Sequence, residues 1–450
     1  MIHITLSEAV DLPECIIKIV GQYILLKDLD LTNADLSNSN LSNSDLSNSN
    51  LSNSNLSNSN LSNSNLSNSN LSNSNLSNID LSHSNLSKSN LSYSNLSNAN
   101  LSNVNLSNAN LNSSNLPNSN LSNSYLVQSN FSNANLTYSN LQYSEFSDSN
   151  LRYSDLRHSD LSYSDLSYSD ISNSNLSNAY MERANLSIVN LSYSNMSCVE
   201  LINTDLSNAK LIHTNLSNAV LSCANLARSK IIHTNLTGSI FTKTTMLYSD
   251  LTNSDLTNSN IIETNMYGSK LTGTKMINTN LLKSELSNSD LTNSDFSNAI
   301  ITDSVLHHSD LSCVNLMNAV LTNTDLYGSN LTCANMVNVK LFGVTITFAN
   351  LTYSNLAAAK IKDSNLTGTD LFEANMIDIR LLRVNLTGAK LIGSYLMNVD
   401  MTDTILIDAN LTNANLQRAD LSNANLLRAD LSNANLTDTK LPEVELNNDE

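Results

Sequence analysis

An apolar residue returns at every fifth position from Leu31 to Leu446 without a break, and this period constrains the fold more than any other feature. Leu fills most of these positions, and Ile, Met or Phe fills the rest, as at Phe131 and Met181. Residues 51–70 read LSNSNLSNSNLSNSNLSNSN, a composition typical of disordered tracts. A disordered tract has no reason to keep one register over most of a chain, so the period indicates a repetitive fold.

The columns around each apolar centre are also restricted. Most often Ser, Ala or Thr, and sometimes Val, stands two places before it, Asn or Asp one place before it, and Ser or Thr one place after it. A period of five fits neither a helix nor a simple strand, but it fits a coil with flat sides and corners. The column two places after the centre is rich in Asn and Gly and is interpreted as the corner, because both tolerate positive φ. Since Tyr153 and His213 share this column, we expect some corners not to need positive φ.

The pattern resembles the pentapeptide-repeat family, whose motif Ala-(Asp/Asn)-Leu-x-x stands here as ADLSN at 34–38, ANLTY at 134–138 and VNLTG at 384–388. The resemblance implies an all-β fold, a right-handed quadrilateral parallel β-helix over 26–446, with four pentapeptides per coil and about 21 coils. The similarity of 210–229 to the segment that follows it supports a coil of four pentapeptides independently.

The two ends fall outside this pattern. Residues 1–25 are predicted to form a helical cap over the first coil, with Asp11 as N-cap and Pro13 in the first turn. The Leu-Pro start of that helix also resembles the opening of an F-box, of which it would be a remnant. Residues 447–450 form an acidic tail. The C-terminal end either folds back as a plug or docks on a partner or a second copy, and the family resemblance allows a homodimer there.

Composition narrows the function classes. The five cysteines form no C-x-x-C pair, which favours reduced thiols in a cytoplasmic protein, in the host cytoplasm if the source is viral. No signal peptide or membrane-spanning run is visible. The histidines are scattered and no catalytic constellation or phosphate loop stands out, so we expect no enzyme, cofactor, metal site or small-molecule substrate.

Two surfaces are candidates for binding a protein partner. The first is a belt of corner tyrosines with one aspartate on each side of a single coil. The second is a stripe in the column before the centre, sampled every fourth repeat, where apolar residues give way to cations that would suit an acidic partner. The belt comprises Tyr138, Tyr143, Tyr153, Asp155, Asp160, Tyr163, Asp165, Tyr168 and Asp170. The stripe comprises Val220, Ile240, Ile300, Val320, Lys340, Lys360 and Arg380.

Three functions are open at this level. The first is a non-catalytic scaffold, a rigid solenoid that presents side-chain stripes to proteins. The second, implied by the resemblance, is a DNA-mimicking modulator of a type II topoisomerase. A net charge of −18 is small for such a mimic, and direct nucleic-acid binding is not expected. The third, an ice-binding array, is a minor alternative because the flat faces favour Asn and Ser over Thr.

Overall fold

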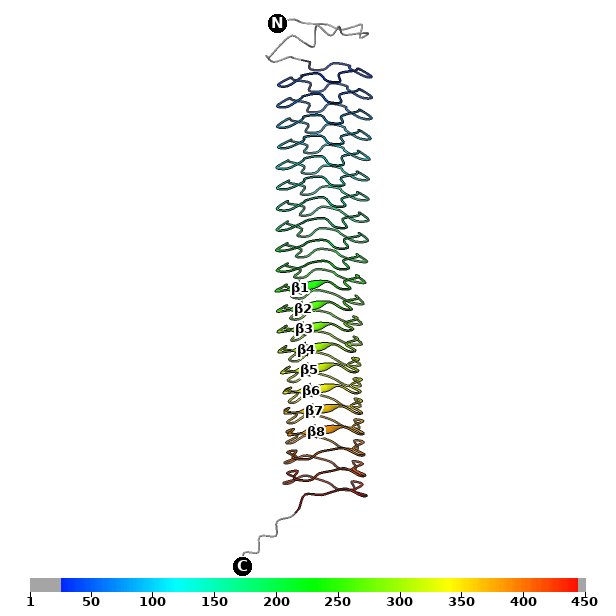
Figure 1. Cartoon of the computed structure of the whole chain (residues 1–450), viewed down its shortest axis with the longest axis vertical. Coiled ribbons are helices and arrows are strands. Elements are labelled where there is room, and N and C mark those ends of the chain that lie inside the picture. The colour runs from blue at the N-terminus through cyan, green and yellow to red at the C-terminus, as the bar shows by residue number, and fades with distance from the viewer. Residues whose placement is uncertain (1–25, 444–450) are drawn as a thin grey trace, which may run out of the picture. The chain divides into compact units, whose positions relative to one another are not determined.

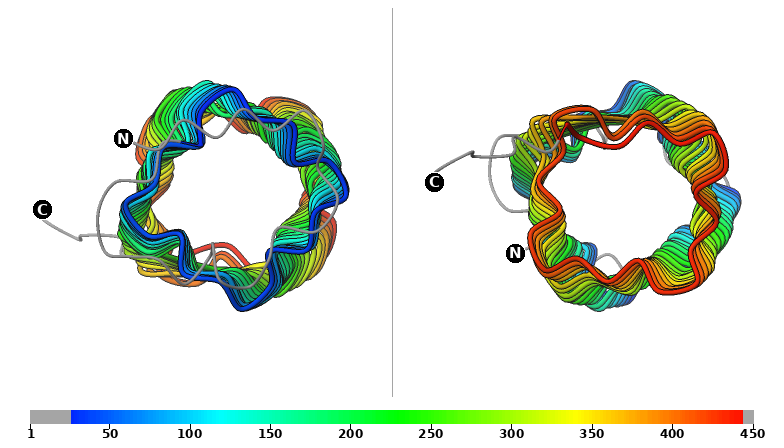
Figure 2. Two further views of the ribbon diagram at one scale, coloured as in Figure 1. Left: turned by 90° about the horizontal axis from the view of Figure 1, so that it is seen from above. Right: turned by 90° about the horizontal axis from the view of Figure 1, so that it is seen from below.

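The computed structural model describes residues 26–443, which fall into two compact units divided at Val220 and Leu221. The helical cap predicted for 1–25 and the acidic tail at 447–450 lie outside the described residues. In each unit the backbone winds in coils that pair with their neighbours through parallel bridges between residues 20 apart, as in Asn50↔Asn70 and Asp370↔Lys390. Figure 2, viewed along the stack, shows how the coils of each unit overlie one another. The predicted coil length is therefore confirmed, whereas its handedness and the number of coils stay predictions.

The apolar centres fill the interior of each coil. Leu46, Leu151 and Leu331 have no exposed surface, and neither do Phe131 and the other phenylalanines of this column. The small residues two places before each centre are also buried, and their hydroxyls donate to the carbonyl oxygen of a centre, as from Ser54 Oγ to Leu51 O at 2.6 Å. Because the hydroxyl is hydrogen-bonded, burying Ser in this column costs little free energy, and this explains why Ser and Ala both occur there.

A regular pentapeptide such as 51–55 satisfies all five of its backbone N–H groups. In 51–55, three N–H groups donate to carbonyls of the neighbouring coils and that of Ser54 closes the turn on Leu51 O at 3.3 Å. The remaining N–H, that of Ser52, has no backbone partner and donates to Asn50 Oδ1 at 3.2 Å. This bond accounts for the preference for Asn or Asp before the centre, because their short side-chain acceptors reach the N–H two residues on.

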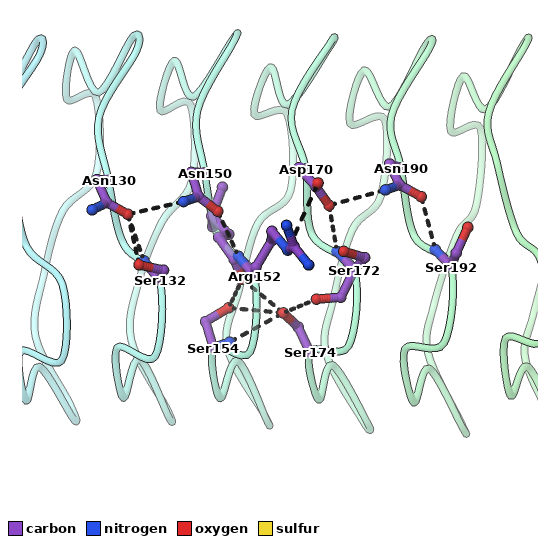
Figure 3. Close-up of polar contacts among 11 residues, drawn as sticks. Asn130, Ser132, Asn150, Arg152, Ser154, Asp170, Ser172, Ser174, Asn190 and Ser192 are labelled. Carbon is purple, nitrogen blue, oxygen red and sulfur yellow. Dashed lines mark hydrogen bonds and ion pairs between the residues drawn. The ribbon is translucent and has the colours of Figure 1, made fainter.

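The asparagines of this column also bond one another. Asn70 Nδ2 donates to Asn50 Oδ1 at 3.1 Å, and Asn90 Nδ2 donates in turn to Asn70 Oδ1 at 3.2 Å. Figure 3 shows the same ladder at Asn130 and Asn150, where each amide donates toward the coil that precedes it in the chain. Asp cannot donate, so the ladder is interrupted between Asn150 and Asp170 and resumes with Asn190 Nδ2 donating to Asp170 Oδ1.

Every corner residue from Asp28 to Asp438 has positive φ, between 49° and 68°. The expectation that Tyr153 and His213 mark corners without positive φ is therefore wrong, since their φ values are 60° and 56°. Even the β-branched Ile188 adopts φ 60°. The left-handed conformation is disfavoured for such residues by roughly 1–2 kcal/mol, and the hydrogen bonds of the coils above and below enforce it.

Within residues 26–443, regular strands form on one side of the second unit only. They are three residues long and begin in the column before the centre, and they pair in order as one parallel sheet (Figure 1). The strands are β1 (Ile240–Thr242), β2 (Asn260–Ile262), β3 (Asn280–Leu282), β4 (Ile300–Thr302), β5 (Val320–Thr322), β6 (Lys340–Phe342), β7 (Lys360–Lys362) and β8 (Arg380–Leu382).

This side concentrates residues that cannot form the side-chain cap. Six of these eight strands begin with Ile, Val, Lys or Arg. The side chains of these residues cannot accept a hydrogen bond from the N–H two residues later, as Asn or Asp does in other repeats. The backbone extends by one more paired residue, and the β-branched side chains favour that conformation. Asn260 and Asn280 lie among these coils and adopt the same extended geometry.

The ladder predicts a graded loss of stability at one asparagine. Asn70→Ala removes the cap of Ser72 N–H and both ladder bonds, so the free energy of unfolding should fall by about 1–3 kcal/mol. Asn70→Asp keeps the bonds accepted from Ser72 N–H and Asn90 Nδ2, so it should lower the free energy of unfolding less. Urea unfolding followed by circular dichroism measures both, with Asn73→Gly, at a corner with φ 57°, as the control. Equal losses in the alanine and aspartate variants would contradict the ladder account.

Candidate functional site

The structure brings the second-unit members of the predicted stripe into one register. Successive strands of the sheet align residue by residue (Figure 1), and the first residue of every strand is exposed or half-buried, so side chains of this column face outward one above another. The aligned column, called the sheet stripe from here on, consists of Ile240, Asn260, Asn280, Ile300, Val320, Lys340, Lys360 and Arg380. Val220 belongs to the first unit, where it pairs with Glu200.

The sheet stripe changes character along its length. Ile300 is 51% exposed, and Val320 is half-buried. Lys340, Lys360 and Arg380 are exposed and lie in adjacent strands, and within residues 26–443 none of the three forms an ion pair. Like charges at this spacing repel one another, so their juxtaposition costs free energy that an anionic partner would recover.

The neighbouring charges leave this end of the sheet basic. Asp363 is already engaged, since Arg383 Nε and Nη2 donate to its two carboxylate oxygens at 2.6 and 2.9 Å. Hydrogen bonds from Arg383 lower the pKa of Asp363, so this carboxylate stays charged and paired. The Lys362 ammonium lies 3.8 Å from the same carboxylate. Arg380 has two further carboxylates near it, Asp378 in its own coil and Asp400 at the paired position of the next coil, so the basic character is strongest at Lys340 and Lys360.

The predicted tyrosine belt encircles the first unit and does not form one surface. Tyr143 stacks on Tyr163 with ring centroids 4.9 Å apart, and Tyr138 stacks on His158 at 4.7 Å. These two pairs occupy different corners, and the remaining two corners hold Tyr153 and Tyr168, which are both exposed. A single flat partner could therefore meet only the tyrosines of one side and its two corners.

The aspartates of the belt have structural partners. Asp160, Asp165 and Asp170 each accept the backbone N–H two residues later at 2.9–3.0 Å. Asp155 receives a two-pronged bond from Arg157, with Nη2 2.7 Å from Oδ2, and this bond raises the pKa of the arginine. The belt thus uses its charges largely within the coil, whereas the sheet stripe leaves its cations unpaired.

A third surface escaped the sequence analysis. Along one corner of the second unit the aromatic rings meet edge to face, and most are well exposed. Tyr327 contacts His308 at 5.3 Å and Phe348 at 6.0 Å between ring centroids, and Phe348 is 63% exposed. We call this set the aromatic ridge, and it consists of Tyr248, Tyr267, His307, His308, Tyr327 and Phe348.

A hollow of about 470 Å³ lies beyond the basic end of the sheet stripe. Charged side chains of both signs line it, and they are Asp378, Arg380, Asp400, Arg418, Asp420, Asp438 and Lys440. Hydrogen bonds from the Ser422 hydroxyl and the Lys440 ammonium lower the pKa of Asp420 to about 2. Carboxylates outnumber cations in this hollow, so it does not extend the basic surface.

The described residues show little that suggests other chemistry. No group of three or more His, Cys, Asp or Glu side chains in residues 26–443 is arranged to hold a metal ion. Cys198, Cys223, Cys313 and Cys333 are exposed free thiols. No helix in the described part of the chain is long and apolar enough to cross a membrane.

Comparison with known proteins agrees with the coil geometry. The model described as pentapeptide repeats matches 30–103, 164–258 and 269–442, and a pentapeptide repeat region matches 99–176. The chain belongs to the pentapeptide-repeat family. No curated protein matches it.

Solved structures of other pentapeptide-repeat proteins are distant. A trypsin-treated QnrB1, a plasmid-mediated fluoroquinolone resistance protein, is 18% identical with a TM-score of 0.31, over 40% of this chain and 86% of that one. HetL, from the cyanobacterium Nostoc sp. strain PCC 7120, is 24% identical with a TM-score of 0.18, over 55% and 90%. A protein of the Arabidopsis thaliana thylakoid lumen is 19% identical with a TM-score of 0.12, over 29% and 69%. These scores carry no argument about function.

Within the pentapeptide-repeat pattern, a signal for the aromatic ridge is present in the sequence. A Cβ added to Gly268 would lie 2.6 Å from a ring carbon of Tyr248, and Gly368 stands in the same relation to Phe348. An exposed corner aromatic is thus followed four repeats later by a glycine over which its ring lies. This pairing of aromatic and glycine at one-coil spacing marks the ridge.

The same geometry predicts the effect of two glycine substitutions. Gly388→Ala meets no atom within 4 Å and carries only the strain of φ +65°, whereas Gly268→Ala adds a clash with the Tyr248 ring. Gly268→Ala should therefore lower the free energy of unfolding by about 1 kcal/mol more than Gly388→Ala. Chemical denaturation of both variants measures the difference. Adding Tyr248→Ala should remove it, and an unchanged difference would exclude the ring as its cause.

The lowered pKa of Asp420 predicts that the stability of the fold depends on pH. Its folded pKa lies below the usual value, so its bonds stabilise the fold above about pH 4 and are lost as the pH falls toward about 2. Asp420→Asn should reduce the loss of stability over that window, as measured by urea unfolding at several pH values. Asp438→Asn, in the same hollow, is the control and should leave the pH dependence unchanged. A parallel change in both variants would contradict the assignment.

Proposed function

We propose that this pentapeptide-repeat protein is a non-catalytic scaffold that binds a protein partner through the sheet stripe. The observation that supports it is a departure from the repeat pattern in the column before the centre, on one side of the second unit. There the capping Asn or Asp is replaced by exposed Ile, Val, Lys and Arg in strict register over β4–β8. Capped repeats such as 51–55 show that the fold does not need these residues, and three cations without an ion pair are unfavourable without an anionic partner.

The other candidate surfaces remain proposals of lower rank. The tyrosine belt divides its rings among four corners, and its aspartates are bonded within the coil. A homodimer through the C-terminal end would use the last described coil, where Leu426, Leu431 and Leu436 are only half-buried. Neither surface combines exposure, register and unpaired charge as the sheet stripe does.

No observation favours the two alternative functions. DNA carries one negative charge per roughly 1.7 Å of its axis, and a mimic must approach this density. Residues 36–120 carry Asp45, Asp80 and Lys88 as their only full charges, and the sheet stripe is basic. For ice binding, the outward columns of this region hold hydrogen-bonded Asn and Ser, as in the ladder of Asn50 and Asn70.

Affinity capture with a charge-reversed variant tests the scaffold proposal. Lys340→Glu, Lys360→Glu and Arg380→Glu together should lose at least one protein that the unchanged chain recovers from cells of its source, because an acidic partner would then be repelled. The matched control reverses Lys88, Lys210 and Arg228, which changes the net charge equally at exposed positions off the sheet stripe. Quantitative mass spectrometry compares the three samples, and identical recoveries would count against the sheet stripe as a binding surface.

A further inference from the structure

We infer that the sheet stripe from Ile300 to Arg380 binds an amphipathic helix of the partner protein, apolar in its N-terminal turns and acidic in its C-terminal turns. This inference rests on the proposed function and specifies the partner. Its basis is the combination of backbone satisfaction, side-chain spacing and charge order on β4–β8.

The backbone of this side is closed to a partner. Each strand between β2 and β7 pairs with the strand before it and the strand after it, so its N–H and C=O groups are used within the sheet. A partner strand that adds to a sheet needs an unpaired edge, and the outward side of the coils presents none between β4 and β7. Recognition on this side must therefore proceed through the side chains of the stripe.

The spacing of those side chains suits a helix that lies along the stack. Neighbouring strands lie about 4.8 Å apart, and a helix advances about 5.4 Å per turn. Over the four intervals from Ile300 to Arg380 the difference adds up to roughly 2.4 Å, which long lysine and arginine side chains can absorb. A partner segment in extended conformation along the same direction would place side chains of one face about every 6.7 Å. It would therefore lose register with the sheet stripe after two strands.

The order of the side chains sets the polarity of the helix. Ile300 and Val320 present apolar surface, and Met317, next to the adjoining corner, is 38% exposed. Lys340, Lys360 and Arg380 follow without an ion pair among the described residues. The C-terminus of a helix carries partial negative charge, so it is favoured over the basic end, with the apolar turns over Ile300 and Val320.

The surface also limits the length of the helix. Beyond Arg380 the same column continues with Asp400, and the hollow beside it holds more carboxylates than cations. An acidic helix would be repelled there. The contact therefore spans five strands, about 19 Å, which corresponds to roughly 13 residues of helix.

Synthetic peptides test the inference with the whole 450-residue chain. The probe is an 18-residue helical peptide with Leu along one face of its N-terminal half and Glu along the same face of its C-terminal half. Two matched peptides carry the same composition in scrambled order, or a central proline. Fluorescence anisotropy should show binding of the probe, at least tenfold weaker binding of both matched peptides, and further weakening at 0.5 M salt for the probe.

Variants of the protein locate the binding. The Lys340→Glu, Lys360→Glu and Arg380→Glu variant should weaken probe binding at least tenfold, and Ile300→Ser with Val320→Ser should weaken it severalfold. The Lys88→Glu, Lys210→Glu and Arg228→Glu control should bind within twofold of the unchanged protein. Circular dichroism of each variant confirms that the coils remain intact.

The outcomes separate this inference from the proposed function. If the scrambled peptide bound as tightly as the probe, net charge alone would explain the binding. If the proline peptide bound as tightly, the bound segment would not be a helix. Either result overturns the inference. Absence of probe binding also overturns it, while the proposed function stands if charge reversal still changes the captured proteins. If neither the peptides nor the captured proteins respond to the sheet stripe, both fail.

Discussion

The stack depends on one hydrogen bond that the backbone cannot make for itself. After a buried centre outside β1–β8 the chain turns so tightly that the next N–H faces no carbonyl, and an unpaired buried donor costs a few kcal/mol. The Oδ1 atom of the preceding Asn or Asp accepts this N–H, as Asn50 does from Ser52 at 3.2 Å. Because the same side chain then bonds to the next coil, one residue type both closes the turn and joins the coils.

The candidate binding surface arises where that rule is abandoned. On the side that carries β1–β8, extended backbone pairing takes the place of the side-chain cap, and the column before the centre becomes free to carry Ile, Val, Lys or Arg. The coil tolerates this because the neighbouring strands supply the missing partners. A scaffold of this kind can therefore vary one outward column without altering its core, which is how a monotonous fold acquires a specific surface.

Particular residues show what could be predicted from the sequence. The five-residue period predicted the buried centres, and the alignment of 210–229 with the next segment predicted the register that places Lys340, Lys360 and Arg380 in adjacent strands. The corner conformation at Tyr153 was mispredicted because local preference is overridden by the hydrogen bonds of two neighbouring coils. The aromatic ridge was missed because its members sit at corners and beside them, and only the glycine one coil later reveals that their rings share a surface.

The opposed directions of the two bonding systems have an electrical consequence. In a regular repeat such as 51–55, two backbone N–H groups point toward the following coil and one points toward the preceding coil. Two of these amide dipoles cancel, so each repeat keeps the dipole of one amide along the axis. The ladder amides, such as Asn70 Nδ2 toward Asn50, point toward the preceding coil and oppose that surplus. An α-helix accumulates partial charge at its ends because its amides all align. An asparagine-rich run of coils cancels much of its own field, so it can lengthen without polarising its termini.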